Sequence, residues 1–161
     1  MILDIITYPN KILTKKTKRV GEFNAATKKL IDDMVATLYA RRGAGLAANQ
    51  VGESKQIIVV DDSRGGGNVK VLINPKIIRK KGTVIMAEGC LSLPGLELEI
   101  KRPDKIEVEF SDKRGQKQKI KANDLLARII CHEVDHLEGK TMLDRLPLLQ
   151  RLKLKRQLRK K

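Results

Sequence analysis

The sequence predicts an α+β fold in which small antiparallel or mixed sheets surround a central helix, with an N-terminal helix before them and a basic helix at the C-terminal end. Two observations support this prediction: helical periodicity in three separate segments, and a group of short β-branched runs between the first two of them. Strands gathered between helices are typical of α+β domains. The chain of 161 residues is long enough for one hydrophobic core and needs no second one.

The first predicted helix spans residues 24–42. Leu30, Met34 and Leu38 lie one helical turn apart and form an apolar stripe that a helix buries against the rest of the protein. Asn24 can cap the start of this helix, and Gly43 can end it.

Three predicted strands follow, over residues 56–62, 70–78 and 82–89. They are rich in Val and Ile and are separated by residues that favour turns. Residues 62–68, between the first two strands, predict a surface loop. Residues 104–121 alternate apolar and charged side chains and turn near Gly115, which predicts a hairpin with one face in water.

Two further helical segments complete the chain. Residues 123–139 carry an apolar face, and Asn123 or Asp124 can cap this central helix. Residues 147–161 place leucines among basic residues and predict an amphipathic basic helix. We therefore expect a main domain of residues 1–146 followed by a basic tail.

Composition limits the classes of function. The formal net charge of +15 attracts polyanions such as nucleic acid or an anionic membrane surface, although solubility alone is an alternative explanation. No apolar run approaches the roughly 18 residues of a membrane span, and the first residues lack the features of a secretory signal, so we expect a cytoplasmic protein without a membrane partner. Two cysteines, Cys90 and Cys131, favour thiols or metal ligands, while a single bridge between them stays open.

The chain has only two histidines, and both lie in the sequence HEVDH. On a helix, His132 and His136 project from nearly the same face and can bind one metal ion, while Glu133 lies about 100° around the helix and can reach water at the ion. The alternative is that His132 and His136 are ordinary surface or core residues that bind no metal. The spacing therefore predicts that the central helix binds a metal.

A catalytic site of the zinc type normally has three protein ligands. The usual protease arrangements place the third ligand downstream, but the position expected for a histidine is Met142, and no glutamate follows Glu138. The third ligand must therefore lie upstream or be an aspartate. Cys90, in the stretch EGCLSLPG, is a better candidate than Cys131, which points away from the ion. One Cys and two His suit zinc, iron(II), cobalt or nickel.

Three stretches together resemble the motifs of the peptide deformylase family. They are GLAANQ at residues 45–50, EGCLS at residues 88–92 and HEVDH at residues 132–136, and they are similar to the family motifs G-x-G-x-A-A-x-Q, E-G-C-L-S and H-E-x-D-H. The resemblance extends over nearly the whole chain. It implies that residues 1–146 are a catalytic domain that removes the formyl group from the N-terminal methionine of nascent polypeptides and releases formate.

The resemblance also implies a metal centre. Cys90, His132 and His136 would bind one divalent ion, with Fe2+ as the expected metal and Zn2+, Ni2+ or Co2+ as alternatives. Glu133 would be the general base and general acid of the reaction.

Other residues match the family at positions around this centre. Gln50 and the backbone N–H of Leu91 would stabilise the developing oxyanion, and the backbone of Gly45 would help to hold the substrate chain. Glu88 and Arg102 would support the ligands.

Formyl-methionine requires an apolar slot. The resemblance implies that Leu125, Ile129 and either Ile85 or Met86 form it. Arg128 lies on the same helix, so we expect its side chain to turn outward and leave the slot apolar.

The basic tail predicts a second partner. Seven residues from Arg151 to the end are Lys or Arg and none is acidic, a composition that binds phosphates. In the family such a helix resembles a ribosome-docking element, so we expect residues 147–161 to bind ribosomal RNA and protein near the peptide exit. We expect the protein to be a monomer. A solvated tail is the alternative. The competing function classes are another metal-dependent amidase or peptidase and a basic ribosome-associated protein without enzyme activity.

Overall fold

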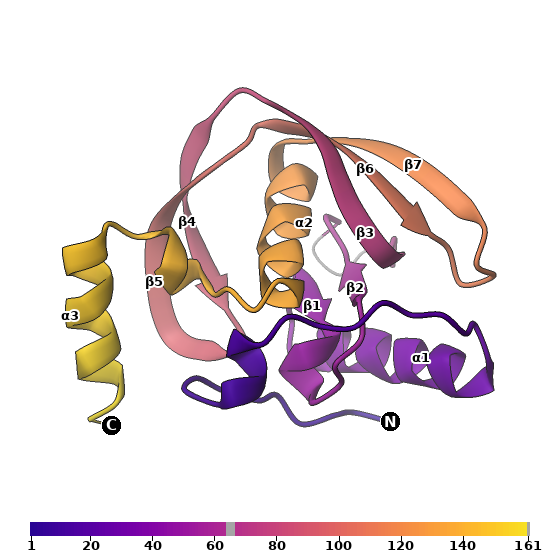
Figure 1. The fold of residues 1–161 in the computed structure, drawn as a ribbon, viewed down its shortest axis with the longest axis horizontal. Coiled ribbons are helices and arrows are strands. Elements are labelled where there is room, and N and C mark those ends of the chain that lie inside the picture. Colours follow the sequence, from indigo (N-terminus) through magenta and orange to yellow (C-terminus); the bar gives the residue numbers. More distant parts are fainter. Residues whose placement is uncertain (64–66, 161) are drawn as a thin grey trace.

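The computed structural model describes residues 1–63 and 67–160, with α2 at the centre between two antiparallel sheets (Figure 1). The three α-helices are α1 (Ala25–Ala40), α2 (Asp124–Leu137) and α3 (Leu148–Leu158). The strands are β1 (Gly45–Ala47), β2 (Ile57–Val60), β3 (Lys70–Lys81), β4 (Val84–Cys90), β5 (Leu93–Arg102), β6 (Lys105–Ser111) and β7 (Lys117–Asn123). Short 3-10 turns are η1 (Lys11–Thr14), η2 (Ala48–Val51) and η3 (Met142–Arg145). The predicted α+β class is confirmed.

The larger sheet has the strand order β1-β2-β3-β6-β7 and is covered by helices on both faces of β2. Ile58 and Val60 belong to the core cluster that includes residues of α2, whereas Ile57 and Val59 belong to the cluster that includes residues of α1. All four side chains are fully buried, and alternate residues of a strand point to opposite faces. This explains why the segment IIVV is continuously apolar and does not alternate with polar residues.

The smaller sheet consists of β4 and β5 and carries Cys90 at the end of β4. Strand β5 was not among the predicted strands, although Leu96, Leu98 and Ile100 alternate with charged residues in the way that a strand requires. Its buried face packs against η3 in a third core cluster.

The predicted caps are partly correct. The Asn24 side chain accepts a hydrogen bond from the Thr27 N–H at 3.0 Å, as expected for an N-cap. Helix α1 ends at Ala40, before the predicted end. Asn123 occupies the N-cap position of α2 but makes no side-chain capping bond. Gly139 follows the end of α2 with a φ of +73°, and a Cβ there would lie 2.8 Å from Thr14 O, so a glycine is required.

The other predicted helices and strands agree with the structure except at their boundaries, whereas β1 and the three 3-10 turns were not predicted. The β6–β7 hairpin is confirmed, β3 continues to Lys81, and the loop expected at residues 62–68 lies partly outside the described residues. In the basic tail, Leu154 and Leu158 pack against the third core cluster, whereas Leu148 and Leu152 are 58% and 55% exposed. In the described part of the chain, no helix has both the length and the apolarity that a membrane crossing requires.

Candidate metal centre

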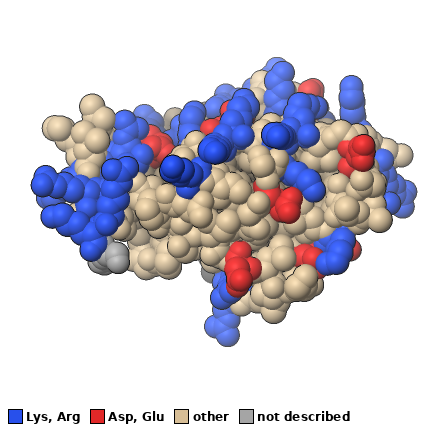
Figure 2. Space-filling model, turned by 60° about the horizontal axis from the view of Figure 1, so that its bottom comes forward, with Lys and Arg blue, Asp and Glu red and all other residues tan. Residues whose placement is uncertain are grey.

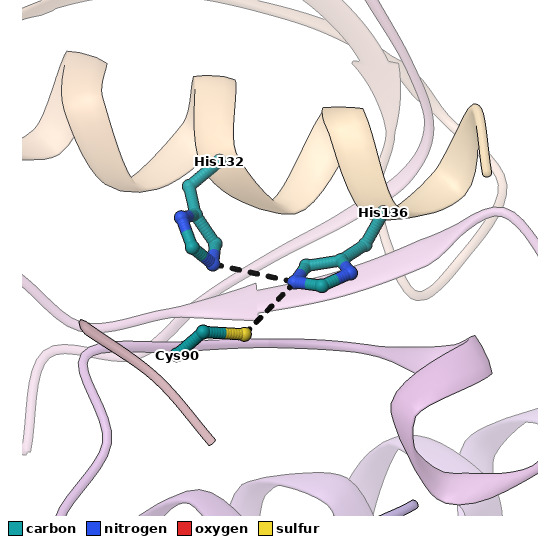
Figure 3. Close-up of side chains that lie close together, drawn as sticks. All are labelled: Cys90, His132 and His136. Atoms are coloured by element: carbon teal, nitrogen blue, oxygen red, sulfur yellow. Dashed lines mark hydrogen bonds between the residues drawn. The ribbon is translucent and has the colours of Figure 1, made fainter. Parts of the chain in front are cut away.

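Three predicted metal ligands lie together between β4 and α2 (Figure 3). The Cys90 Sγ lies 3.2 Å from the His136 Nε2, and that nitrogen lies 3.3 Å from the His132 Nε2. Helix α2 places the two imidazoles on one face because they are four residues apart, and the end of β4 brings the thiol from the opposite side.

The donor set fits a divalent metal ion. Two nitrogens bound to one tetrahedral ion at about 2.0–2.1 Å lie roughly 3.3 Å apart, and the two imidazole nitrogens have this separation. The second cysteine, Cys131, is buried in the core cluster between α2 and the larger sheet, as predicted. Both cysteines are free thiols, so a bridge between them is excluded.

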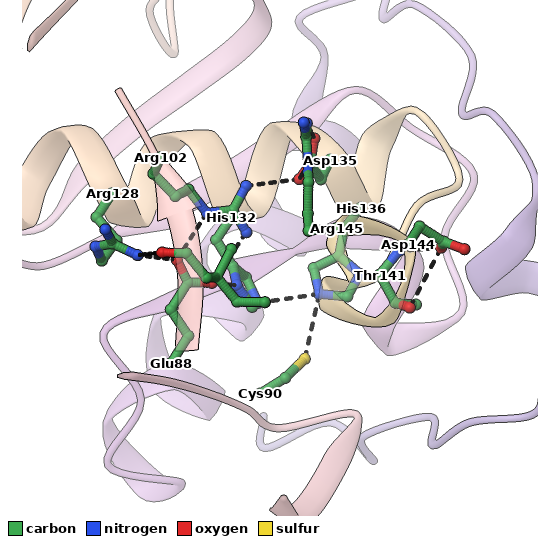
Figure 4. Close-up of polar contacts among 11 residues, drawn as sticks. Glu88, Cys90, Arg102, Arg128, His132, Asp135, His136, Thr141, Asp144 and Arg145 are labelled. Atoms are coloured by element: carbon green, nitrogen blue, oxygen red, sulfur yellow. Dashed lines mark hydrogen bonds and ion pairs between the residues drawn. The ribbon is translucent and has the colours of Figure 1, made fainter. Parts of the chain in front are cut away.

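A buried carboxylate, Glu88, fixes one of the ligands (Figure 4). Its Oε2 lies 2.9 Å from the His132 Nδ1, and it accepts hydrogen bonds from Arg102 at 2.7 and 2.9 Å. Burial alone would raise the pKa of Glu88, but the hydrogen bonds from His132 and Arg102 lower it to about 2. The ionised carboxylate holds the Nδ1–H, so the Nε2 of His132 points toward Cys90, as is typical of metal-binding histidines.

A second buried carboxylate, Asp135, extends this network to η3. Arg102 Nη1 donates to Asp135 Oδ2 at 2.6 Å, and Arg145 binds both carboxylate oxygens at 2.5 and 2.8 Å. Burial would raise the pKa of Asp135, but the hydrogen bond from Arg145 and the charge of Arg102 lower it. Arg102 therefore bridges two carboxylates and ties β5 to α2. The expected support of the ligands by Glu88 and Arg102 matches this geometry.

The expected outward turn of Arg128 is wrong. Its side chain is buried, and its Nη1 donates to Glu88 Oε1 at 2.6 Å and to the Ile100 carbonyl at 2.9 Å, while its Nη2 donates to the Val84 carbonyl at 2.8 Å. A carboxylate and two carbonyls compensate the burial of the charge. The sequence around Arg128 could not predict the burial of its side chain, because the acceptors lie 28 to 44 residues away in the chain.

A cavity of about 490 Å³ opens beside the donors. It is lined by most of the predicted functional residues: Gly45, Gln50, Cys90, Leu91, Leu125, Ile129, His132 and Glu133. Arg128 and Glu88 also line it, so part of the wall is polar. Ile85 and Met86 do not line it, and they are 62% and 45% exposed. Their expected place in the slot is wrong, and Ala87 lines the cavity instead.

Glu133 has an environment opposite to that of Glu88. It is 3% exposed, and its Oε2 has no hydrogen-bond partner among the residues that the structure describes. Burial raises the pKa of Glu133 to about 7, against the lowering effect of His132 and Arg102. A carboxyl group with a pKa near neutrality can both accept and donate a proton.

Gln50 is oriented by its neighbours. Its Oε1 accepts a hydrogen bond from the Ala47 N–H at 2.8 Å, and its Nε2 donates to the Ser92 Oγ at 3.1 Å and faces the Cys90 Sγ at 3.6 Å. The amide nitrogen of Gln50 therefore lies beside Cys90, with a hydrogen bond to Ser92 that holds it there. The sequence had not indicated Ser92, because no spacing rule connects it with Gln50.

Gly45 allows β1 to approach α2 closely. A Cβ at this position would lie 2.7 Å from the Ile129 Cγ2 and 2.8 Å from the Glu133 Cγ. Any larger residue would therefore push into the floor of the cavity.

The fold and the site together define a metal-dependent hydrolase, because a Cys–His–His donor set, a buried carboxyl group with a raised pKa and an adjoining cavity meet at one place. The family model described as polypeptide deformylase matches residues 2–152. The chain therefore belongs to the polypeptide deformylase family, whose members remove the N-formyl group from nascent polypeptides.

Individual relatives agree with this assignment. The chain is 49% identical over 138 residues to a peptide deformylase of Symbiobacterium thermophilum, and the matched region covers 86% of this chain and 64% of that relative. It is 44% identical over 152 residues to the peptide deformylase of Thermodesulfovibrio yellowstonii, covering 93% and 92% of the two chains. The crystal structure of a peptide deformylase from Legionella pneumophila superposes with a TM-score of 0.92 at 37% identity and covers 99% of this chain and 95% of that one.

The two cysteines provide a matched test of the metal centre. We expect Cys90→Ala to weaken metal binding by more than the roughly 10–100-fold that loss of an outer hydrogen-bond partner causes, because it removes a ligand atom. Cys131→Ala should keep its metal, because its sulfur packs in the core. Elemental analysis of both proteins after dialysis measures the difference. Retention of metal by Cys90→Ala would contradict the site.

Proposed function

We propose that Cys90, His132 and His136 hold one divalent ion at which Glu133 moves the proton during removal of the formyl group. The observation that supports this most strongly is the position of Glu133, a buried carboxyl group without a partner among the described residues that lines the same cavity as Cys90 and His132. The substrate we propose is the formylated N-terminal methionine of a nascent polypeptide in the cytoplasm.

The ion that we propose is Fe2+. One thiolate and two imidazoles also accept Zn2+, Ni2+ and Co2+, and the supply of metal decides among them. When bound, such an ion supplies a Lewis acid that lowers the pKa of water toward neutrality. The contribution of the protein is the rigid arrangement of the three donors, which the ionised Glu88 and its arginines maintain.

Glu133 accepts a proton from the attacking water and returns it to the amine that leaves. The leaving amine must depart as a neutral molecule, so a group that holds and then releases a proton is required. Its pKa of about 7, raised by burial, suits both steps near neutral pH. Its side chain lines the cavity together with Cys90 and His132.

Gln50 and the backbone N–H of Leu91 stabilise the negative charge that develops on the formyl oxygen. The bond from the Ala47 N–H to Gln50 Oε1 fixes the direction of the amide, so the Nε2 donor needs no reorientation during the reaction. A donor fixed in advance in this way is typically worth about 3 kcal/mol in the transition state. Gly45 leaves its backbone accessible to the substrate chain at the cavity wall.

The role of Glu133 can be separated from metal binding. We expect Glu133→Gln to release formate from a formyl-methionyl peptide roughly 10²–10⁴ times more slowly while it retains its metal, because only the proton acceptor is lost. The control is Glu138→Gln, which changes an exposed glutamate at the end of the same helix that pairs with Lys16. Formate release and elemental analysis are measured together. Unchanged turnover in Glu133→Gln would refute the proposed role.

We also propose that the basic tail docks the protein on the ribosome near the peptide exit. Helix α3 offers exposed basic side chains together with exposed leucines, and Leu149 is 82% exposed. Its phosphate contacts would place the catalytic domain close to emerging chains.

The docking proposal is tested by charge removal. We expect the tail variant, Lys153→Gln with Arg156→Gln, to sediment less with ribosomes at low salt and to keep full activity on a free formyl peptide, because both residues are exposed and neither lines the cavity. The matched control is Lys11→Gln with Lys28→Gln, which removes the same charge from the other end of the chain. Equal sedimentation of the tail variant and this control would contradict the proposal.

A further inference from the structure

The side of α2 that faces away from the metal centre borders a second hollow, of about 310 Å³, between α2, β3 and the end of β5. Six of its thirteen lining residues are basic, and we call this hollow the basic groove; they are Lys76, Lys80, Lys101, Arg102, Lys140 and Arg145. Its acidic residues are Asp135 and Glu138. The catalytic cavity differs, because its basic lining residues are Arg42 and Arg128, and Arg128 is paired with Glu88.

The acidic groups of the basic groove already have partners. Asp135 binds Arg102 and Arg145, and the Glu138 Oε2 lies 2.8 Å from the Lys16 Nζ. The exposed lysines are different: within residues 1–63 and 67–160, no ion pair involves Lys76, Lys80, Lys101 or Lys140. Their positive charges are therefore available to an anionic partner.

The basic groove and the catalytic cavity lie on opposite sides of α2. Cys131 and Asp135 line the groove, whereas Ile129 and Glu133 line the cavity. At about 100° per residue, these two pairs project in roughly opposite directions from the helix axis. A partner bound in the groove therefore leaves the entrance to the metal centre open.

The basic groove is continuous with the basic tail. A neighbouring hollow is lined by Arg151 and Lys155 of α3, both paired with Asp144, and shares Lys140 and Arg145 with the groove. At its other end, the groove shares Lys76 with a hollow beside β7. Figure 2 shows Lys and Arg side chains crowded over the end of the molecule that α3 occupies and along the upper edge of the same face.

We propose that the basic groove binds the phosphate backbone of RNA as a continuation of the contact made by α3. The inference rests on the proposed ribosome docking and gives it a second surface. Unpaired ammonium groups neutralise phosphates and release their counterions, which makes such binding strongly dependent on salt. A concave hollow admits a narrow polynucleotide backbone, whereas a flat bilayer cannot enter it. RNA held on this side of α2 leaves the opposite side to the formyl peptide.

The test uses the full chain and a short fluorescent RNA duplex. The groove variant is Lys80→Gln with Lys101→Gln, and the matched control is again Lys11→Gln with Lys28→Gln, which are also exposed lysines. We expect the groove variant to bind the duplex more weakly and to show a slope of log affinity against log salt that is smaller by about 2, roughly 1 for each lysine that no longer neutralises a phosphate. The control should have the same RNA affinity and salt slope as the unchanged protein. Formate release from a free peptide should be equal in the unchanged protein, the groove variant and the control.

Equal affinity and equal salt slope in the groove variant and the control would overturn the proposal. If the tail variant alone weakened RNA binding, docking through α3 would stand and the groove would not contribute. If the groove variant alone weakened it, the groove would bind RNA without α3, and the proposed continuation with the tail would be overturned. A groove variant that lost binding to phosphatidylglycerol vesicles but kept its affinity for RNA would assign the surface to membranes and also overturn the proposal.

Discussion

The ion pairs of the buried carboxylate of Glu88 are the interaction on which the rest of the structure depends. Arg102 on β5 and Arg128 on α2 donate hydrogen bonds to this carboxylate. The carboxylate is also hydrogen-bonded to the Nδ1 of His132. A buried carboxylate is tolerated only when its charge and lone pairs are satisfied, so these contacts fix the β4–β5 sheet against α2. Cys90 lies two residues further along β4, where the register of the β4–β5 pair shifts between Gly89 and Cys90, and its thiol approaches His136.

Two buried glutamates, Glu88 on β4 and Glu133 on α2, have different electrostatic environments. Glu88 is surrounded by arginines, and its pKa is lowered to about 2, so it stays ionised and structural. The Oε2 of Glu133 has no hydrogen-bond partner among the described residues, and burial raises the pKa of Glu133 to about 7, which suits the proton transfer proposed for it. This separation of pKa values between neighbouring carboxyl groups is how proteins divide structural and acid–base roles. Asp135 and Arg145 extend the network to the back of α2, where the catalytic side gives way to the basic groove.

Local patterns in the sequence were sufficient for α1 and for the placement of the two histidines on one face of α2, because these signals are short in range. Helical spacing identified α1 and the two histidines, and exclusion of the downstream alternatives left Cys90 as the better third ligand. Strand β5 was missed although its alternation is visible in the sequence. The burial of Arg128 was not visible there, because it depends on carbonyl acceptors brought from β4 and β5 by tertiary folding. Ile85 failed as a wall of the slot because exposure depends on which layers cover a strand.

The central claim is that the charge on Glu88 orients His132 for metal binding, and metal affinity measures it most directly. The affinity of Glu88→Gln for Zn2+ or Co2+, determined by competition with a chromophoric chelator, should be about 10–100 times weaker than that of the unchanged protein, as is typical when the hydrogen-bond partner of a ligating histidine is lost. Glu138→Gln, at the exposed end of the same helix, should bind normally. An unchanged affinity in a folded Glu88→Gln protein would contradict the account.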